Sequence, residues 1–336
     1  MTADALRYGL FIPQGWRLDL VGIAPAEQWQ RMLQVAQAAD AGAWDSVWVY
    51  DHFHTTPQPT QEATHEAWSL MAALAASTER VRLGQMCTCM GYRNPAYLAK
   101  VAATVDVISG GRVEFGIGAG WYEHEWRAYG YGFPGVGDRI SALRDGVQLI
   151  QRLWADGEAS IESESFTIDG AICQPQPLQA GRDGAPRIPT WIAGGGEKRT
   201  LRYAAKWADA TNFGGSPEQF ARKRDILHQH LEREGRDPAE VRLSSNLNIV
   251  VRETEAEALR VVEAVQQRAD AAMPAEHAGT GFSTRGAIVG TPQQVLDHVG
   301  ALREAGLGTL IAYMPELAFD RDGMELFERE VMPALA

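Results

Sequence analysis

A histidine beside an aspartate follows one of the apolar runs of the chain, in residues 50–54. Imidazole exchanges protons near neutral pH, so His52 is a candidate general acid, and Asp51 is a candidate to orient it or to contact a bound ring. A solvated loop is the alternative. The spacing of His52 and His54 also matches the metal-binding pair of barrel hydrolases, which take further histidine and acidic ligands from later strand ends. The fifth, sixth and eighth apolar runs end without a histidine, so we expect no metal.

Three consecutive glycines, Gly194, Gly195 and Gly196, stand between an apolar run and a helical pattern. Backbone N–H groups at a helix start that is preceded by glycines form an anion site. The alternative is an ordinary turn in which Lys198 and Arg199 are solvated. Three glycines exceed what such a turn needs, so the pattern predicts a phosphate-binding loop.

A second glycine pattern, G-x-G-x-G, covers residues 116–120. It lacks the G-x-G-x-x-G spacing of a dinucleotide fold, and no strand with an acidic end follows at the right distance. Glycine lets a backbone approach a ligand closely, so Ala119 and Gly120 are candidate cofactor contacts. The aromatic and acidic residues that follow, with His124 among them, are further candidates.

Two cysteines lie in a mostly apolar strip, residues 86–90. No second cysteine pair stands nearby to complete a zinc site with Cys87 and Cys89. Buried, inert thiols are therefore the better interpretation. A soft strip of this kind at a strand end suits the face of a flat aromatic ring.

Eight short apolar runs, with helical stretches between them, must position these residues. Their lack of alternation is typical of strands buried on both faces, as in parallel sheets covered by helices. Eight such units predict an α/β fold of the (β/α)8 TIM-barrel class, whose active sites lie at the C-terminal ends of the strands. The runs are Leu10–Ile12, Ser46–Tyr50, Val81–Met86, Val113–Ile117, Thr190–Ala193, Ala208–Phe213, Leu247–Val251 and Thr309–Tyr313.

The domain organisation follows from the connections between these runs. No Ser/Gly linker divides the chain, so we expect a single domain over residues 1–336. Helices are predicted at 139–153 and 292–305, among others. Two stretches, about 155–189 and 252–289, exceed an ordinary connection and are predicted insertions at the C-terminal face.

Composition excludes several classes of function. The 336 residues include 31 Lys and Arg against 43 Asp and Glu, a net charge of -12, which argues against nucleic-acid binding. No apolar run has the length of a membrane span, and residues 1–7 do not resemble a signal peptide. Three cysteines cannot build a disulfide framework in a chain of this length. We therefore expect a cytoplasmic protein.

The order of these segments resembles the luciferase-like monooxygenase superfamily, and more closely its oxidoreductases that use the deazaflavin coenzyme F420. The resemblance runs from the first apolar run to the eighth. Its most specific parts are Ile108–Arg112 and Gly118–Tyr122, together with Asp51–Phe53, Tyr92–Pro95 and Gly194–Arg199. It implies a flavin-like ring at the C-terminal mouth of the barrel, hydride transfer to or from a small organic substrate, and a homodimer.

Roles carried over from the family fall on matching positions. His52 would lie by the reacting ring and act in catalysis. Met86-Cys87 falls where the family often has a bulge with a non-proline cis peptide against the ring. The residues implied to bind the cofactor are Asp51, Met86, Cys87, Thr88, Cys89, Ala119, Gly120, His124, Gly194, Gly195 and Gly196.

One departure from the family concerns the substrate. The sugar-phosphate dehydrogenases of the superfamily have a catalytic glutamate where this chain has Trp121. A reductase or a monooxygenase-like role with a bulkier, apolar substrate is therefore expected in place of glucose-6-phosphate oxidation. Four tryptophans are candidates to line its pocket: Trp16, Trp44, Trp68 and Trp126.

Three functions stay open. The first is a deazaflavin-dependent hydride-transfer enzyme. The second is an FMN-dependent monooxygenase that receives reduced flavin from a separate reductase. The third is a barrel that binds a flavin without catalysis.

Overall fold

The structure is a computed structural model that describes residues 5–281 and 286–335. Residues 1–4, 282–285 and 336 lie outside the described part. The expectation that the chain begins without a signal peptide, and part of the predicted 252–289 insertion, therefore fall outside it. Within the described ranges, none of the helices has both the length and the apolar character needed to span a bilayer.

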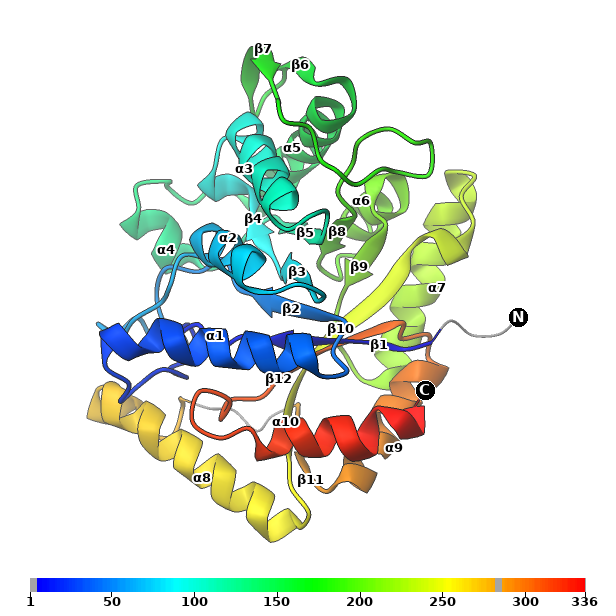
Figure 1. The fold of residues 1–336 in the computed structure, drawn as a ribbon. Coiled ribbons are helices and arrows are strands. Elements are labelled where there is room, and N and C mark those ends of the chain that lie inside the picture. The colour runs from blue at the N-terminus through cyan, green and yellow to red at the C-terminus, as the bar shows by residue number, and fades with distance from the viewer. Residues whose placement is uncertain (1–4, 282–285, 336) are drawn as a thin grey trace. The chain divides into compact units, whose positions relative to one another are not determined.

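The chain is a (β/α)8 TIM barrel, as the sequence predicts (Figure 1). All eight predicted strands are present, although β10 begins at Arg242, earlier than expected. The barrel strands are β1 (Arg7–Phe11), β2 (Ser46–Val49), β3 (Arg82–Gln85), β5 (Val113–Gly118), β8 (Thr190–Ala193), β9 (Ala210–Asn212), β10 (Arg242–Val251) and β12 (Thr309–Tyr313). The main helices are α1 (Pro25–Ala41), α2 (Ala67–Ser77), α3 (Pro95–Ile108), α5 (Val136–Asp156), α6 (Thr200–Trp207), α7 (Pro217–Arg233), α8 (Glu255–Ala272) and α9 (Pro292–Glu304).

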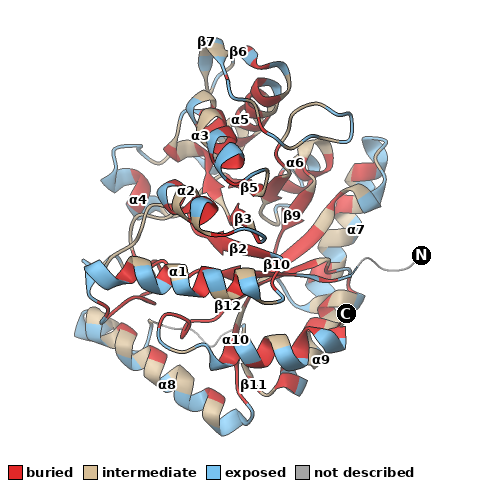
Figure 2. Ribbon diagram, in the orientation of Figure 1, coloured by how far each residue is buried: buried red, intermediate tan, exposed pale blue. Residues whose placement is uncertain are grey.

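Burial explains why the strands read as continuous apolar runs. Every residue of β2, β5 and β12 is buried, while the helices carry buried and exposed residues on opposite faces (Figure 2). Strands that pack on both faces are rich in apolar side chains, and a buried polar residue among them is hydrogen-bonded, as Glu114 of β5 is by the Trp191 indole at 2.6 Å. The helices need apolar side chains only on the face turned to the strands.

The chain forms two compact units. One comprises Met1–Ala67, Gly214–Ala221 and Leu243–Ala336, and the other comprises Trp68–Phe213 and Arg222–Arg242. In the first, β12 pairs in parallel with β1 and β10, and β1 pairs with β2. In the second, β5 pairs in parallel with β3, with the short strand β4 (Thr88–Cys89) and with β8, and β8 pairs with β9. A single domain over the whole chain stays a prediction.

The most family-specific segment, Ile108–Arg112, has a structural role in the second unit. Gly110 and Gly111 have φ of +69° and +87°, a conformation that glycine adopts without the cost of a side chain. The Arg112 guanidinium then donates hydrogen bonds to the carbonyls of Ala75, Thr78 and Val81 and to the Thr78 hydroxyl. This segment therefore joins the end of α2 to the start of β5, away from the C-terminal strand ends.

Both predicted insertions contain strands that the sequence reading missed. The first holds an antiparallel hairpin of β6 (Glu158–Glu162) and β7 (Thr167–Ile172). The second holds α8 and then β11 (Ala287–Gly290), which pairs in parallel with β10. The hairpin is mostly exposed and carries charged residues, so it lacks the apolar run on which the strand assignment depended.

Candidate active site

Each unit carries its own group of candidate residues at the C-terminal ends of its strands. In a (β/α)8 barrel these ends hold the catalytic groups, and the opposite ends serve stability. The first unit contributes the loops after β1 and β2 and the end of β12. The second contributes the loops after β3, β5 and β8.

In the first unit, His52 packs against Trp16. The imidazole and indole rings are stacked, with centroids 4.1 Å apart and planes 1° from parallel. Trp16 follows β1 and His52 follows β2, and these two strands are paired. Asp51, beside His52, is buried. The stack covers one face of the imidazole.

Below this stack lies a group of buried aromatic rings. The Tyr50 ring is stacked on Phe11 at 4.1 Å and lies 4.3 Å from the Trp16 ring. The Tyr313 hydroxyl donates to the Asp19 carboxylate at 3.2 Å, and the Gly15 N–H donates to the same carboxylate at 2.6 Å. Burial raises the pKa of Asp19, and these hydrogen bonds oppose the rise.

In the second unit, the Met86–Cys87 peptide bond is cis, as the family resemblance implies. Met86 is buried and Cys87 is half-buried, so the expectation that both thiols are buried is wrong for Cys87. The Thr88 hydroxyl is buried and donates to the Gln85 amide oxygen at 2.7 Å. The hydrogen bond from Thr88 to Gln85 holds residues 86–90 in place. Within these residues, the half-buried sulfur of Cys87 is the group best placed to contact a ring.

The glycines after β5 make room for these sulfur atoms. A Cβ on Gly118 would lie 2.6 Å from the Cys87 sulfur, and one on Gly120 would lie 2.5 Å from the Cys89 sulfur. Gly120 also has φ of +77°. The sequence predicts that glycines here let the backbone approach a ligand closely. In the structure, it is the cysteine strip that lies close to these glycines. Gly120 and Ala119 are half-buried at the strand end.

The glycine run after β8 has a cationic neighbour that the sequence reading missed. A Cβ on Gly195 would lie 2.8 Å from the ammonium nitrogen of Lys223, which comes from α7. The same ammonium lies 5.6 Å from the Phe213 ring centroid, at the end of β9. Gly194 has φ of +125°, and α6 begins six residues later. Lys223 stands between Arg222 and Arg224 on a polar helix, where a basic run is ordinarily solvated, so the sequence alone does not single it out.

The acidic residues after β5 are engaged in the structure. Glu123 is exposed and pairs with Arg127 at 2.7 Å. Glu125 is fully buried and accepts a hydrogen bond from the Tyr92 hydroxyl at 2.9 Å. His124 is exposed, and its ring lies 6.1 Å from that of Tyr122.

The four tryptophans divide between the two ends of the strands. Trp16 stacks on His52, and Trp126 lies against Gly120. Trp44 comes before β2 and stacks on Phe327 at 5.5 Å, so it belongs to the core at the opposite end. Trp68 packs on Phe115 inside the second unit. The prediction that all four line a pocket is therefore wrong for Trp44.

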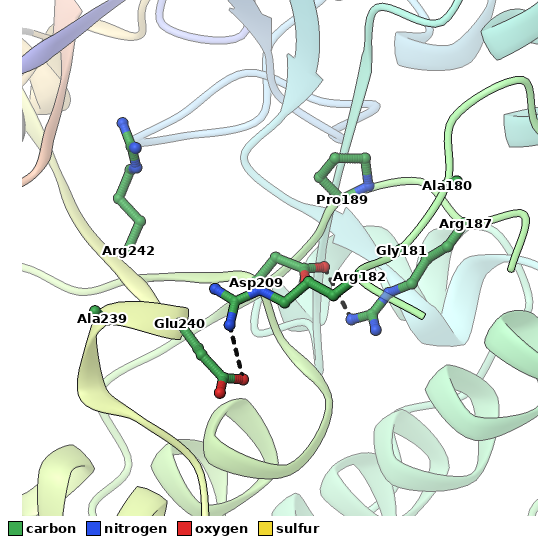
Figure 3. Close-up of a pocket in the computed structure, with 9 residues that line it drawn as sticks. All are labelled: Ala180, Gly181, Arg182, Arg187, Pro189, Asp209, Ala239, Glu240 and Arg242. Atoms are coloured by element: carbon green, nitrogen blue, oxygen red, sulfur yellow. Dashed lines mark hydrogen bonds and ion pairs between the residues drawn. The ribbon is translucent and has the colours of Figure 1, made fainter. Parts of the chain in front are cut away.

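A pocket of about 250 Å³ lies at the amino ends of β8 and β9 (Figure 3). Arginines dominate it, but Arg187 pairs with Asp209 at 2.9 Å and Arg182 pairs with Glu240 at 3.3 Å. These ion pairs join neighbouring loops at the end of the strands opposite the catalytic one. We assign them to stability.

Comparison with known proteins agrees with this arrangement. A family model described as luciferase-like monooxygenase matches residues 6–309. The F420-dependent glucose-6-phosphate dehydrogenase of Kineococcus radiotolerans is 31% identical over 254 residues, 73% of this chain and 72% of that enzyme. The enzyme of the same name from Amycolatopsis mediterranei is 31% identical over 191 residues, and this match spans 54% of its length.

A solved structure of an F420-dependent secondary alcohol dehydrogenase, in complex with an F420-acetone adduct, shares the fold. Its TM-score is 0.77 at 21% identity, with 99% of both chains covered. The chain belongs to the luciferase-like monooxygenase family and is an oxidoreductase.

Proposed function

We propose that this enzyme uses coenzyme F420 and acts as a reductase on small organic substrates. The observation that carries the proposal is the ammonium of Lys223 beside Gly195, within the run Gly194–Gly196. A cation next to exposed backbone suits the phosphate of a coenzyme side chain. The names of the F420-dependent relatives favour deazaflavin over FMN.

The second unit fits a ring as well as an anionic side chain. The half-buried Cys87, Ala119 and Gly120 gather at the ends of β3 and β5, where Cys89 pairs with Gly118. A soft, weakly polar surface of this kind suits one face of a planar heterocycle. We infer that Met86, Cys87, Thr88 and Cys89 support the ring from one side.

When bound, reduced coenzyme F420 supplies a hydride. The substrate carbon that accepts it leaves negative charge on an oxygen, nitrogen or carbon atom, which then needs a proton. We infer that His52 delivers that proton from its nitrogen edge, with its plane set by the stack on Trp16. Asp51, buried next to it, helps to orient the loop.

The proposed direction of reaction rests on Trp121. Where the family's sugar-phosphate dehydrogenases have a catalytic glutamate, this chain has a tryptophan that is 61% exposed. An indole cannot act as their acid or base. We therefore propose reduction of an activated C=C, C=N or C=O bond in place of sugar-phosphate oxidation.

The second candidate is an FMN-dependent monooxygenase with a separate reductase, favoured by the description of the family model. The decisive experiment is titration of the purified protein with oxidised and reduced F420 and FMN, followed by tryptophan fluorescence. We expect tight binding of F420 and weak binding of FMN. Micromolar FMN binding with no detectable F420 binding would establish the monooxygenase alternative.

Turnover separates catalysis from binding alone. Reduced F420 should be oxidised in the presence of an activated alkene or ketone, without oxygen consumption. Binding of F420 without turnover of any such substrate would favour a non-catalytic barrel. A homodimer and a cytoplasmic location are part of the same proposal and need sedimentation and localisation measurements.

A further inference from the structure

The side chain of Arg17 lies over an aromatic platform in the first unit, formed by Trp16, Tyr50 and Tyr313. Its guanidinium carbon is 5.0, 5.3 and 4.6 Å from these three ring centroids, respectively. Aromatic faces attract a cation, and guanidinium is the side-chain cation that stacks best on them. The platform therefore fixes both the position and the plane of the Arg17 head group.

No carboxylate in the described part of the chain forms an ion pair with Arg17, although the charge of Arg17 lowers the pKa of the buried Asp19. One of the terminal nitrogens of Arg17 donates to the amide oxygen of Asn248 at 3.0 Å, and this is a neutral acceptor. Across residues 5–281 and 286–335, no Asp or Glu lies within 4.0 Å of Arg17 to form an ion pair. The remaining N–H donors of Arg17 lie in the planar fork of the guanidinium. This geometry matches the oxygen atoms of a carboxylate or a phosphate.

The surroundings of Arg17 offer donors more than acceptors. The Tyr50 hydroxyl and the Trp16 N–H are buried and find no acceptor in the described part of the chain. Burial raises the pKa of both Tyr50 and Tyr313, so these phenols keep their protons. Asp19 is the nearby acid, and its two oxygens already accept from Gly15 and Tyr313. The half-buried guanidinium of Arg17, with hydrogen-bond donors around it, therefore suits an anion; we call it the anion receptor.

The receptor stands on the catalytic face, next to His52. Tyr313 is the last residue of β12 and is in register with Asn248 of β10, so both lie toward the C-terminal ends of their strands. Trp16 contacts both groups, since its indole stacks on His52 at 4.1 Å and lies 5.0 Å from the Arg17 head group. The Trp16 indole therefore contacts both the imidazole of His52 and the head group of Arg17.

We propose that Arg17 binds an anionic group of the substrate, a carboxylate or a phosphate, while His52 serves the reducible bond of the same molecule. The proposal rests on the proposed reductase function and replaces the neutral, apolar substrate expected from the sequence with an unsaturated or carbonyl compound that carries an acid group. The anionic side chain of the coenzyme is the other source of such a group.

Binding of simple anions tests the receptor without turnover. Acetate, inorganic phosphate and the neutral isostere acetamide are titrated into the wild type, Arg17→Gln, Arg17→Lys and the exposed control Arg31→Gln, by calorimetry. We expect acetate or phosphate to bind the wild type and Arg31→Gln, and to bind Arg17→Gln roughly tenfold or more weakly. Equal affinity for acetate and acetamide, or no change in Arg17→Gln, would overturn the proposal.

Kinetics then identifies the source of the anion. An α,β-unsaturated ketone that carries a carboxylate is compared with its methyl ester, using reduced F420. Arg17→Gln should lower kcat/KM for the acid roughly tenfold or more and leave the ester unchanged. A loss of F420 affinity with an unchanged acid-to-ester ratio would assign Arg17 to the coenzyme and refute the substrate proposal.

The anion titrations and the kinetics with reduced F420 test the Arg17 proposal and the reductase function separately. If F420 neither binds nor reacts, the reductase function fails, and the anion titrations still decide whether Arg17 is a receptor. Thermal unfolding of Arg17→Gln, which removes the charge, shows whether the platform needs the cation to fold, and Arg17→Lys, which keeps the charge and loses the fork, is its control.

Discussion

The rings of Trp16 and His52 lie parallel at 4.1 Å, and this stack joins the loop after β1 to the loop after β2. A stacked imidazole keeps its plane. A general acid must be held in a fixed geometry to deliver its proton. The stack is therefore a positioning device for His52 as much as a packing contact.

The first prediction is that replacing His52 with alanine lowers kcat and leaves F420 affinity nearly unchanged. Loss of a general acid or base typically costs about 100- to 10,000-fold in rate. Steady-state kinetics and a fluorescence titration on the same variant measure the two quantities. His54→Ala, two residues away in the same loop, is the control and should retain kcat. Weakened F420 binding with normal turnover at saturation would make His52 a packing residue.

Enlarging Gly195 should weaken binding of the coenzyme. The Cβ of Gly195→Leu would collide with the Lys223 ammonium, which would have to move away from the loop. We expect F420 affinity to fall at least about tenfold, or about 1.4 kcal/mol. The melting temperature should stay near that of the wild type, because a lysine head group moves easily. Gly300→Leu, where a Cβ meets nothing within 4 Å, is the control; unchanged affinity in Gly195→Leu would place the phosphate elsewhere.

Lys223 should carry part of the electrostatic attraction for the coenzyme. Lys223→Gln is expected to lower F420 affinity several-fold. Salt screens the attraction between the Lys223 charge and the coenzyme, so binding by the variant should be less sensitive to salt. Lys198→Gln, in the glycine loop itself, is the matched control, since Lys198 is exposed. Titration at two salt concentrations distinguishes them. A larger effect for Lys198 would restore the sequence-based view that the loop's own cations matter.

The strands could be predicted because both of their faces are buried. Four successive residues of β12, Leu310–Tyr313, are apolar without alternation, and this pattern is typical of a parallel, helix-covered sheet. The exposed hairpin of β6 and β7 has no such constraint and carries charges, so the sequence did not reveal it. Its existence depends on pairing between Glu158–Glu162 and Thr167–Ile172.

The site was predictable where one short segment carries the chemistry. His52 and the glycine run stand directly after apolar runs, so the barrel rule alone brings them to one end. Arg17 and Lys223 depend on contacts between separate elements. Arg17 becomes a candidate only when its aromatic platform is seen, and Lys223 only when α7 places it beside Gly195.

The final prediction concerns a buried ionic cluster beyond β10 and β12. Glu316 is 2% exposed; one of its carboxylate oxygens accepts from Arg252 at 3.0 Å, and the other has no hydrogen-bond partner within the described residues. Arg252 also binds Asp320 at 2.5 Å. Burial raises the pKa of Glu316 to about 7, and Arg252 opposes the rise.

The pKa of Glu316 is higher in the folded state than in the unfolded state, so ionisation of Glu316 destabilises the folded protein. The stability that its neutral form provides is fully present below the unfolded pKa of 4.5 and is lost as the pH rises through about 7. Glu316→Gln keeps the shape and removes the titration. We therefore expect the free energy of unfolding of the variant, relative to the wild type, to rise between pH 4.5 and 7.5 by up to about 3 kcal/mol. Denaturant unfolding across this range measures it, with the exposed Glu325→Gln as the control; parallel profiles for wild type and Glu316→Gln would mean that Glu316 ionises at its ordinary pH and that Arg252 fully compensates its burial.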